Sequence, residues 1–207
     1  MKRGLFITIE GIDGSGKTTQ MGLIRDYASS IGCDVVMVRD PGGTRISEEI
    51  RRIILDPDRT EMGYCTEMLL YAAARAQMIS EVIKPSVEQG KVVICDRFVD
   101  STYAYQGFGR GIALEVLENI NNIAIEGILP DVTFFFDLDP ERAMERRMAS
   151  STTDRMENEK MDFHKKVYQG YVKLAEKYPG RIKRIDSSRP VETVWNDIKL
   201  VLDNILK

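Results

Sequence analysis

Five short runs of β-branched and other apolar residues recur along the chain, each separated from the next by a longer segment with a helical pattern. The runs cover residues 5–9, 35–38, 92–95, 132–136 and 181–185. Several of them are nearly continuous apolar runs, which are typical of strands that are covered on both faces. Because strands that alternate with helices favour right-handed crossovers, this order predicts an α/β fold. We expect a parallel sheet of these five strands, flanked by helices on both faces.

The segments between the runs carry the apolar spacing of amphipathic helices. Two such faces are formed by Ile46, Ile50, Ile53 and Ile54, and by Val191, Val194, Trp195, Ile198, Leu202 and Ile205. The segment of residues 61–89 is long enough for a helix of many turns. A chain of 207 residues has the size of one domain, so we expect residues 1–207 to form a single domain.

The charge balance excludes some classes of partner. The 29 basic and 32 acidic residues give a net charge of −3, whereas proteins that bind nucleic acid or membrane surfaces are usually basic. No apolar stretch reaches the ~18 residues of a membrane span, and the run at residues 5–9 is too short for a signal peptide. We expect no nucleic-acid or membrane partner, so any phosphate site must be local.

Cysteine and histidine usage narrows the chemistry further. Cys33, Cys65 and Cys95 are odd in number and widely spaced, which is not the pattern of a disulfide framework or a C-x-x-C site. His164 is the only histidine, so a Ser-His-Asp triad or a multi-histidine zinc site would be hard to build. A reducing, cytoplasmic location is the simplest expectation.

A phosphate-binding loop follows the first predicted strand. Gly11, Gly16, Lys17 and Thr18 match the pattern G-x-x-x-x-G-K-[ST] at the start of a predicted helix. Glycines let successive N–H groups converge on phosphate oxygens, and the helix N-terminus adds a partial positive charge. Lys17 can reach the β/γ oxygens and the Thr18 hydroxyl can ligate Mg²⁺. The residues expected to hold a nucleoside triphosphate are Gly11, Ile12, Asp13, Gly14, Ser15, Gly16, Lys17, Thr18 and Thr19.

Triphosphate binding alone leaves a switch, a motor and a kinase open. Residues 40–43 form a D-x-x-G sequence after a strand, as in GTPases, but no N-K-x-D sequence is present to bind guanine. A small-molecule kinase needs a cationic acceptor site and a closing lid. Asp96 and Arg97 end a predicted strand at the edge where ligands bind, so Asp96 could hold Mg²⁺-bound water and Arg97 a phosphate. An ordinary ion pair at a strand end is the alternative.

The chain resembles the thymidylate kinases over almost its entire length. Residues 96–107 match their D-R-[YFH]-x-x-S-x-x-A-Y-Q-G motif, and residues 40–44 match E-P-G-G-T with Asp40 in place of Glu. Further matches cover residues 6–20, 70–77, 130–131, 137–141, 154–157, 163 and 170–171. The resemblance implies a P-loop nucleoside-monophosphate-kinase-like fold with a short lid at about residues 148–158. It also implies ATP-dependent phosphorylation of thymidine monophosphate (dTMP) to the diphosphate in deoxynucleotide biosynthesis.

The resemblance assigns the acceptor site residue by residue. Tyr71 would stack on the thymine and Arg75, one helical turn later, would hydrogen-bond its edge. Tyr105 would pack beneath the deoxyribose, where a 2′-hydroxyl would otherwise lie. The remaining positions implied for the acceptor are Ser101 and Thr102 at the polar edge of the base, Gln106 at the base or a loop, and Arg97 at the phosphate, with Arg39 or Arg45 as helpers.

The resemblance also implies the catalytic groups. These are Lys17, Asp96, Arg97, Arg155 and Asp13, with Mg²⁺ at Thr18 and Asp96 and with Asp13 at the sugar 3′-hydroxyl or a metal-bound water. Residues 12–15 of the loop carry no cation, so the charge is expected from the lid, as in bacterial-type members. Arg155 is the expected lid cation and Arg146 is expected at the adenine end, while Arg147 could assist or lie on the surface.

The neutral stretch 148–153 departs from relatives that have more lid arginines. The family further implies a homodimer, formed through long helices such as residues 61–89. Two alternative functions remain open on the sequence. One is a deoxynucleoside kinase that phosphorylates the 5′-hydroxyl of thymidine, and the other is a nucleotide-binding switch or scaffold that hydrolyses slowly.

Overall fold

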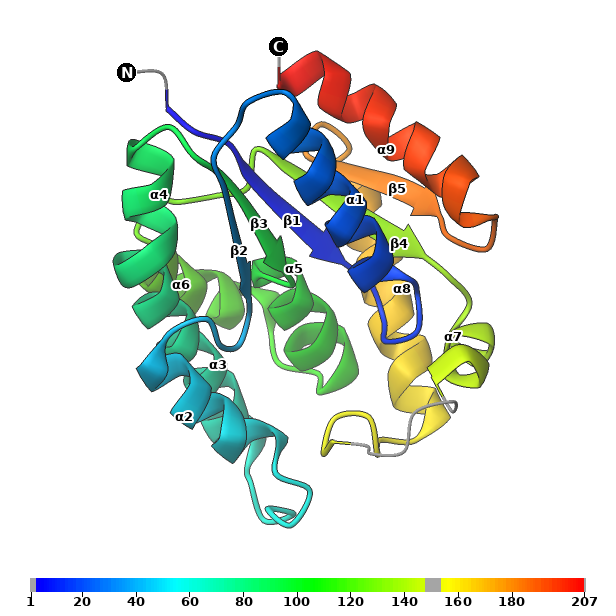
Figure 1. Ribbon diagram of the computed structural model, residues 1–207. Helices are drawn as coiled ribbons and strands as arrows, with labels where there is room; N and C mark the ends of the chain where they lie inside the picture. The colour runs from blue at the N-terminus through cyan, green and yellow to red at the C-terminus, as the bar shows by residue number, and fades with distance from the viewer. Residues whose placement is uncertain (1–2, 148–153, 207) are drawn as a thin grey trace.

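The computed structural model describes residues 3–147 and 154–206, whose core is a parallel sheet of five strands in the order β2-β3-β1-β4-β5 (Figure 1). The strands are β1 (Phe6–Glu10), β2 (Val35–Arg39), β3 (Val92–Asp96), β4 (Val132–Asp137) and β5 (Ile182–Asp186). Each lies within one residue of its predicted run at both ends. The predicted α/β fold is confirmed.

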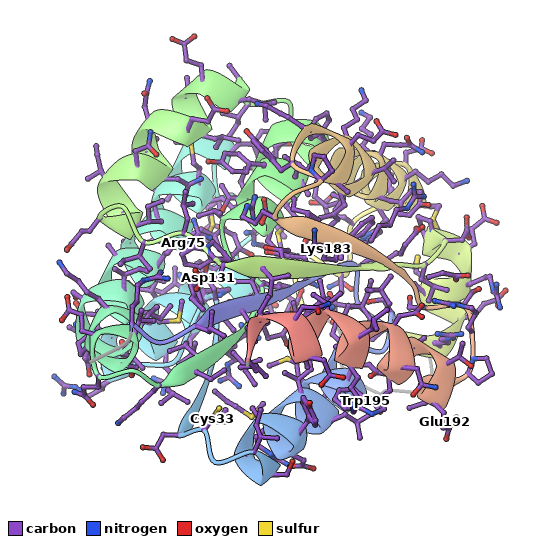
Figure 2. All side chains as sticks on the ribbon, turned by 90° about the horizontal axis from the view of Figure 1, so that it is seen from above. Cys33, Arg75, Asp131, Lys183, Glu192 and Trp195 are labelled. Carbon is purple, nitrogen blue, oxygen red and sulfur yellow. The ribbon has the colours of Figure 1, made fainter. Side chains whose placement is uncertain are left out.

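Helices cover both faces of the sheet because its central strands are apolar on both sides. Ile7 and Ile9 of β1 face α1 (Lys17–Ser30) and α9 (Val191–Ile205), which lie on one side of the sheet (Figure 2). Phe6 of the same strand belongs to the core on the opposite side. Every residue of β1 is buried, as expected for a central strand.

The predicted helix over residues 61–89 is interrupted. It begins as α3 (Tyr64–Met78), continues as a π-helical segment η1 (Ile79–Ile83) and ends as α4 (Lys84–Glu88). Ile79 and Ile83 are fully buried and pack under Phe6 and Val93 of the sheet. A π-helical segment changes which residues face the sheet without ending the helix.

The apolar face predicted around α2 (Arg45–Leu55) is divided between core and surface. Ile54 is fully buried, whereas Ile46 and Ile53 are 45% and 40% exposed. The helix begins at the N-cap Thr44, whose hydroxyl oxygen accepts from Ser47 N at 3.1 Å.

The remaining helices bring residues far apart in sequence to the carboxyl ends of the strands. They are α5 (Val99–Thr102), the π-helical η2 (Tyr103–Gly109), α6 (Leu114–Ile125), α7 (Pro140–Arg147) and α8 (Met161–Lys177). Segment η2 packs along α8, and the motif of residues 96–107 begins at Asp96, the last residue of β3. No helix within the described ranges is both long and apolar enough to cross a membrane.

Candidate active site

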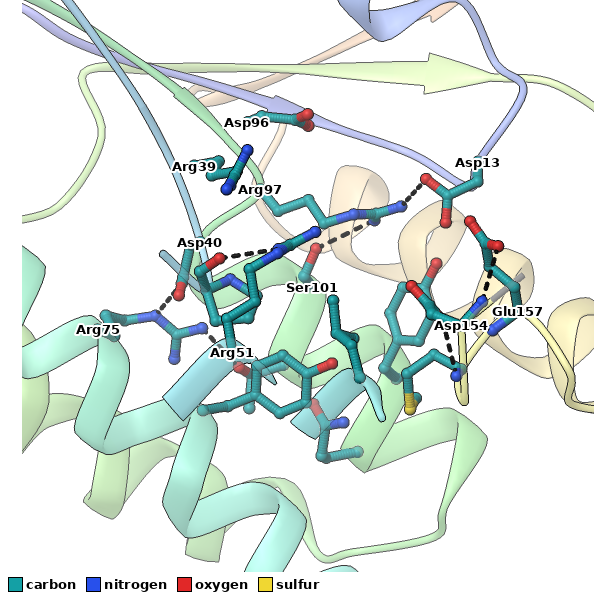
Figure 3. Close-up of a pocket in the computed structure, with 17 residues that line it drawn as sticks. Asp13, Arg39, Asp40, Arg51, Arg75, Asp96, Arg97, Ser101, Asp154 and Glu157 are labelled. Carbon is teal, nitrogen blue, oxygen red and sulfur yellow. Dashed lines mark hydrogen bonds and ion pairs between the residues drawn. The ribbon is translucent and has the colours of Figure 1, made fainter. Parts of the chain in front are cut away.

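A cavity opens beyond the carboxyl ends of β1, β2 and β3, and we call it the strand-end cavity (Figure 3). It collects side chains from α2, α3, η2 and the segment that precedes α8. Its lining residues are Asp13, Arg39, Asp40, Pro41, Arg51, Leu55, Tyr71, Arg75, Asp96, Arg97, Ser101, Thr102, Tyr105, Gln106, Asp154, Met156 and Glu157. All seven residues that the sequence assigned to the acceptor therefore line one cavity.

A second cavity, which we call the phosphate-loop cavity, adjoins the first. It is lined by Asp13, Gly14, Gly16, Lys17, Thr18, Thr19, Asp96, Arg146 and Arg147. Asp13 and Asp96 belong to both cavities, so the two spaces meet at these carboxylates. A ligand in one cavity would therefore face a ligand in the other.

The phosphate loop needs glycine where it approaches α7. Gly14 has a φ of +86°, and a Cβ there would lie 2.1 Å from the carbonyl oxygen of Ala143. Helix α1 begins at Lys17 directly after the loop, so its N-terminal N–H groups face the cavity. Backbone of this shape at a helix N-terminus is suited to bind phosphate oxygens.

Lys17 is the buried cation of the phosphate loop. Its Nζ donates to the carbonyl oxygens of Gly11 and Ile12 at 3.0 and 3.1 Å, and lies 3.4 Å from Asp13 Oδ1. Burial and the nearby charge of Arg97 lower the pKa of Lys17. A bound phosphate would supply the negative charge that a buried ammonium group needs.

Arg97 is one of the four arginines among the described residues that line the strand-end cavity, and it lies nearest in sequence to the end of β3. Its backbone is in the left-handed region, with a φ of +66°, directly after β3. Its Nη2 lies 2.8 Å from Asp13 Oδ1, while its Nη1 donates to Tyr171 Oη at 3.2 Å (the Asp13 contact is drawn in Figure 3). These contacts hold the guanidinium group beside Asp13, which lines both cavities.

Glu10 holds the loop that carries Arg97, and the sequence did not indicate this role. Its carboxylate accepts hydrogen bonds from Phe98 N at 2.7 Å, Ser101 Oγ at 2.6 Å and Tyr171 Oη at 2.9 Å. Glu10 is fully buried, and burial, followed by the charge of Asp100, raises its pKa to about 7. Ser101 and Tyr171 thus connect the end of β1 to the guanidinium group of Arg97.

Arg75 is fixed before any ligand binds. Its Nε donates to Asp40 Oδ2 at 2.6 Å (Figure 3), and its Nη1 donates to Asn121 Oδ1 at 2.6 Å. Its Nη2 donates to Thr102 Oγ1 at 2.9 Å and to Phe98 O at 3.4 Å. Among the described residues these bonds use four of its five N–H groups and leave one on Nη1 for a ligand.

Among the arginines expected around the lid, two reach the phosphate loop and one does not. Arg146 and Arg147 line the phosphate-loop cavity. Arg147 Nη2 also donates to both carboxylate oxygens of Glu157, each at 2.7 Å. Arg155 points elsewhere, because its Nη1 lies 2.7 Å from Glu67 Oε2 and its Nε donates to Ile54 O at 2.8 Å. It lines neither cavity. Within the expected lid, residues 148–153 lie outside the described residues.

The sequence also missed Arg51, which lines the strand-end cavity together with Arg97 (Figure 3). Its Nη1 donates to Pro41 O at 2.8 Å, so it lies against the loop after β2. A basic residue two turns into the helix that follows residues 40–44 was the available signal. Of the two expected helpers, Arg39 lines the cavity, whereas Arg45 is exposed and does not.

The fold and the two adjoining cavities define a P-loop phosphotransferase of the nucleoside-monophosphate-kinase class. The sequence model of the family "Thymidylate kinase" matches residues 9–198. The chain therefore belongs to the thymidylate kinase family, as its motifs indicated.

Curated relatives and a solved structure agree with this assignment. A thymidylate kinase of Clostridium novyi (strain NT) is 46% identical over 201 residues, covering 96% of this chain and 98% of its own. One of Thermoanaerobacter sp. (strain X514) is 47% identical over 196 residues, covering 95% and 96%. The crystal structure of thymidylate kinase from Ehrlichia chaffeensis is similar with a TM-score of 0.79 at 36% identity, over 97% of this chain and 99% of that one.

Proposed function

We propose that this chain transfers the γ-phosphoryl group of ATP to the phosphate of dTMP, giving the diphosphate and ADP. Family membership supports the reaction, and one observation carries it for this chain. The phosphate-loop cavity with Lys17 and the strand-end cavity with Arg97 meet at Asp13 and Asp96. Two anionic nucleotides bound there would lie head to head, with a cation on each side to offset their repulsion.

The phosphate loop is the proposed ATP site. Its backbone N–H groups and Lys17 would hold the β- and γ-phosphates, with Thr19 beside them and Arg146 toward the adenine. Arg146 also donates to Ser187 O at 3.2 Å, in the segment that follows β5. Buried donors that are already oriented need no rearrangement when charge develops, which favours transfer.

The residues present fit Mg²⁺. Thr18 and Asp96 both line the phosphate-loop cavity, and Asp96 Oδ1 is buried without a hydrogen-bond partner among the described residues. Mg²⁺ typically binds one or two protein oxygens together with substrate phosphates and waters. The described residues contain no cluster of three or more metal-ligating side chains, which is consistent with that mode. When bound there, the ion would supply positive charge that offsets the charge developing on the transferred phosphoryl group.

The strand-end cavity is the proposed dTMP site. We place the acceptor phosphate at Arg97, the base against Tyr71 and Arg75, and the sugar against Tyr105, with Ser101, Thr102 and Gln106 completing the lining. An oxygen of the acceptor phosphate then attacks the γ-phosphorus in line, while the bond to the β–γ bridging oxygen breaks. The attacking oxygen is already anionic at neutral pH, so this step needs no general base.

Arg155 keeps its predicted role only if it leaves Glu67, to which it is bound in this structure. Arg147 already lines the phosphate-loop cavity, so it competes with Arg155 as the cation at the moving phosphoryl group. Lys17 and Arg97 supply positive charge in either case. Asp13 and Asp96 would orient the acceptor and the metal-bound waters.

We further propose a cytoplasmic homodimer that associates through α2, α3 and α6. Helix α3 packs against both α2 and α6, and all three carry large apolar side chains that this chain leaves exposed. The side chains are Ile46, Ile53, Leu69, Val116 and Ile123, of which Ile123 is 81% exposed. A second copy that covers this face would remove it from water.

The function is tested by offering ATP with either dTMP or thymidine as the acceptor. We expect dTMP to be turned over and thymidine to be a poor acceptor, because a hydroxyl acceptor has no charge for Arg97 to bind. Faster phosphorylation of thymidine would instead identify a deoxynucleoside kinase. ATP hydrolysis without transfer to either acceptor would identify a switch or scaffold.

A further inference from the structure

Glu67 is a fully buried carboxylate at the base of the proposed acceptor site. It lies in the first turn of α3, one turn before Tyr71 and two turns before Arg75, which both line the strand-end cavity. Glu67 itself does not line the cavity. A buried carboxylate needs several strong partners, so its contacts show what it holds in place.

Four donors surround this carboxylate. Gln106 Nε2 donates to Oε1 at 2.8 Å, and Arg110 donates to both oxygens, from Nε at 3.2 Å and from Nη2 at 3.1 Å. Arg155 Nη1 lies 2.7 Å from Oε2. Burial alone would raise the pKa of Glu67, but the hydrogen bonds from Arg110 and Gln106 and the charges of both arginines lower it below its ordinary value. Glu67 is therefore ionised.

An ionised carboxylate can only accept hydrogen bonds. The NH₂ group of Gln106 must therefore face Glu67, and the amide cannot turn over without bringing its carbonyl oxygen against negative charge. Gln106 is 1% exposed and lines the strand-end cavity. Besides the second N–H of its NH₂ group, Gln106 then has its carbonyl Oε1 to offer a ligand, and Oε1 is its one acceptor atom.

The cavity consequently presents an acceptor from Gln106 and a donor from Arg75, whose remaining N–H is on Nη1. Thymine carries the complementary pair on one edge, the N3–H donor beside the O4 acceptor. Cytosine carries the reverse pair, an N3 acceptor beside a 4-amino donor, so it would leave both protein groups without partners. Buried polar groups without partners are costly, and such sites reject the wrong ligand strongly.

We propose that Glu67 is a positioning residue that sets the base preference of this enzyme. By fixing the orientation of the Gln106 amide, it makes the acceptor cavity complementary to a thymine-type base and unfavourable for cytosine. This inference rests on the proposed function, because the acceptor base has to lie beside Tyr71 and Arg75.

In the variant Glu67→Gln, we expect the side-chain amide of Gln106 to turn over. Two arginine N–H groups converge on the Oε2 position, whereas Oε1 receives one arginine N–H and the Gln106 amide. The carbonyl oxygen of the new side chain is therefore expected at the Oε2 position, with its NH₂ toward Gln106. Gln106 then turns its carbonyl oxygen to that NH₂ and its own NH₂ to the cavity. This change removes the acceptor for N3–H of thymine and offers a donor to N3 of cytosine, while Arg75 still faces position 4 of either base.

The control is Glu159→Gln. Glu159 Oε1 accepts from Arg110 Nη1 at 2.5 Å, so this variant disturbs the same arginine from its other end. Among the described residues, Glu159 forms no hydrogen bond with Gln106, and it lines neither cavity. A loss that comes only from loosening Arg110 would appear in both variants.

The experiment measures the dissociation constants of dTMP and dCMP by calorimetry, together with kcat/KM for both acceptors with ATP. We expect Glu67→Gln to weaken dTMP binding and to shift the preference toward dCMP by about tenfold or more. We expect Glu159→Gln to leave that preference within about twofold of wild type. Equal weakening of both nucleotides by Glu67→Gln would overturn the proposal.

A second variant decides the matter if Glu67→Gln is unfolded by circular dichroism. Gln106→Leu removes the oriented carbonyl, and we expect the preference for dTMP over dCMP to fall by about tenfold. An unchanged preference in Gln106→Leu would overturn the proposal. Wild-type binding of dTMP without phosphorylation would refute the proposed function, while the binding preferences of the variants would still test Glu67.

Discussion

The buried carboxyl of Glu10 makes the stability of this protein depend on pH near neutrality, and Glu10→Gln isolates that dependence. In the folded protein, burial and the charge of Asp100 raise the pKa of Glu10 to about 7 from an ordinary 4.5. As the pH rises, the Glu10 carboxyl therefore ionises at a higher pH in the folded protein than in the unfolded chain. Gln has the shape of the protonated acid but cannot ionise, so it matches Glu10 at low pH only.

The sign and size of the effect follow from proton linkage. A raised pKa in the folded state gives stability that is complete below the unfolded pKa and is lost as the pH rises through the folded one. A shift from 4.5 to about 7 corresponds to roughly 3 kcal/mol, and most of this change falls between pH 5 and pH 8. Over that interval, the wild type should lose about this much free energy of unfolding relative to Glu10→Gln.

Urea unfolding of both proteins at pH 5, 6, 7 and 8 measures this difference. Subtracting the two curves removes the titration of every group that they share. We expect Glu10→Gln to have the smaller free energy of unfolding at pH 5. Its difference from the wild type should shrink at each step toward pH 8. Parallel curves would show that Glu10 is ionised in the fold and would refute the assignment of its raised pKa.

Three further outcomes are expected. Arg97→Ala should raise the KM for dTMP at least about tenfold and leave ATP affinity nearly unchanged, because Arg97 lies in the strand-end cavity; equal losses in steady-state kinetics would contradict its role. Arg147→Ala should lower kcat more than Arg155→Ala, since only Arg147 lines the phosphate-loop cavity; the reverse order would show that Arg155 moves to the phosphates. Ile123→Asp should yield a monomer by sedimentation equilibrium, and a persisting dimer would place the interface elsewhere.

The strands and the phosphate loop were predictable because both depend on residues adjacent in sequence. A run such as residues 132–136 is apolar enough to be a buried strand in any α/β context. The glycine spacing before Lys17 likewise defines a local backbone shape. The π-helical segment Ile79–Ile83 was not predictable, because what distinguishes it is how its residues pack against Phe6 and Val93 rather than their own propensity.

The candidate site divides in the same way. Tyr71, Arg75 and Arg97 were found through motifs, and all three line the strand-end cavity. Glu10 and Glu67 were not found, because each is defined by partners far along the chain: Glu10 binds Tyr171, and Glu67 binds Gln106 and Arg155. Sequence spacing carries no signal for such contacts when no residue pattern connects the two ends.

The missed residues follow from the ones that were found. Placing Arg75, Arg97 and Arg110 in apolar surroundings would cost several kcal/mol each if their charges were unpaired, whereas exposed pairs such as Arg39 with Glu48 contribute little. Each buried guanidinium group therefore requires a carboxylate nearby: Asp40 for Arg75, Asp13 for Arg97, and Glu67 with Glu159 for Arg110. An arginine that a motif assigns to a buried site thus predicts an acidic partner, although only the fold decides which one.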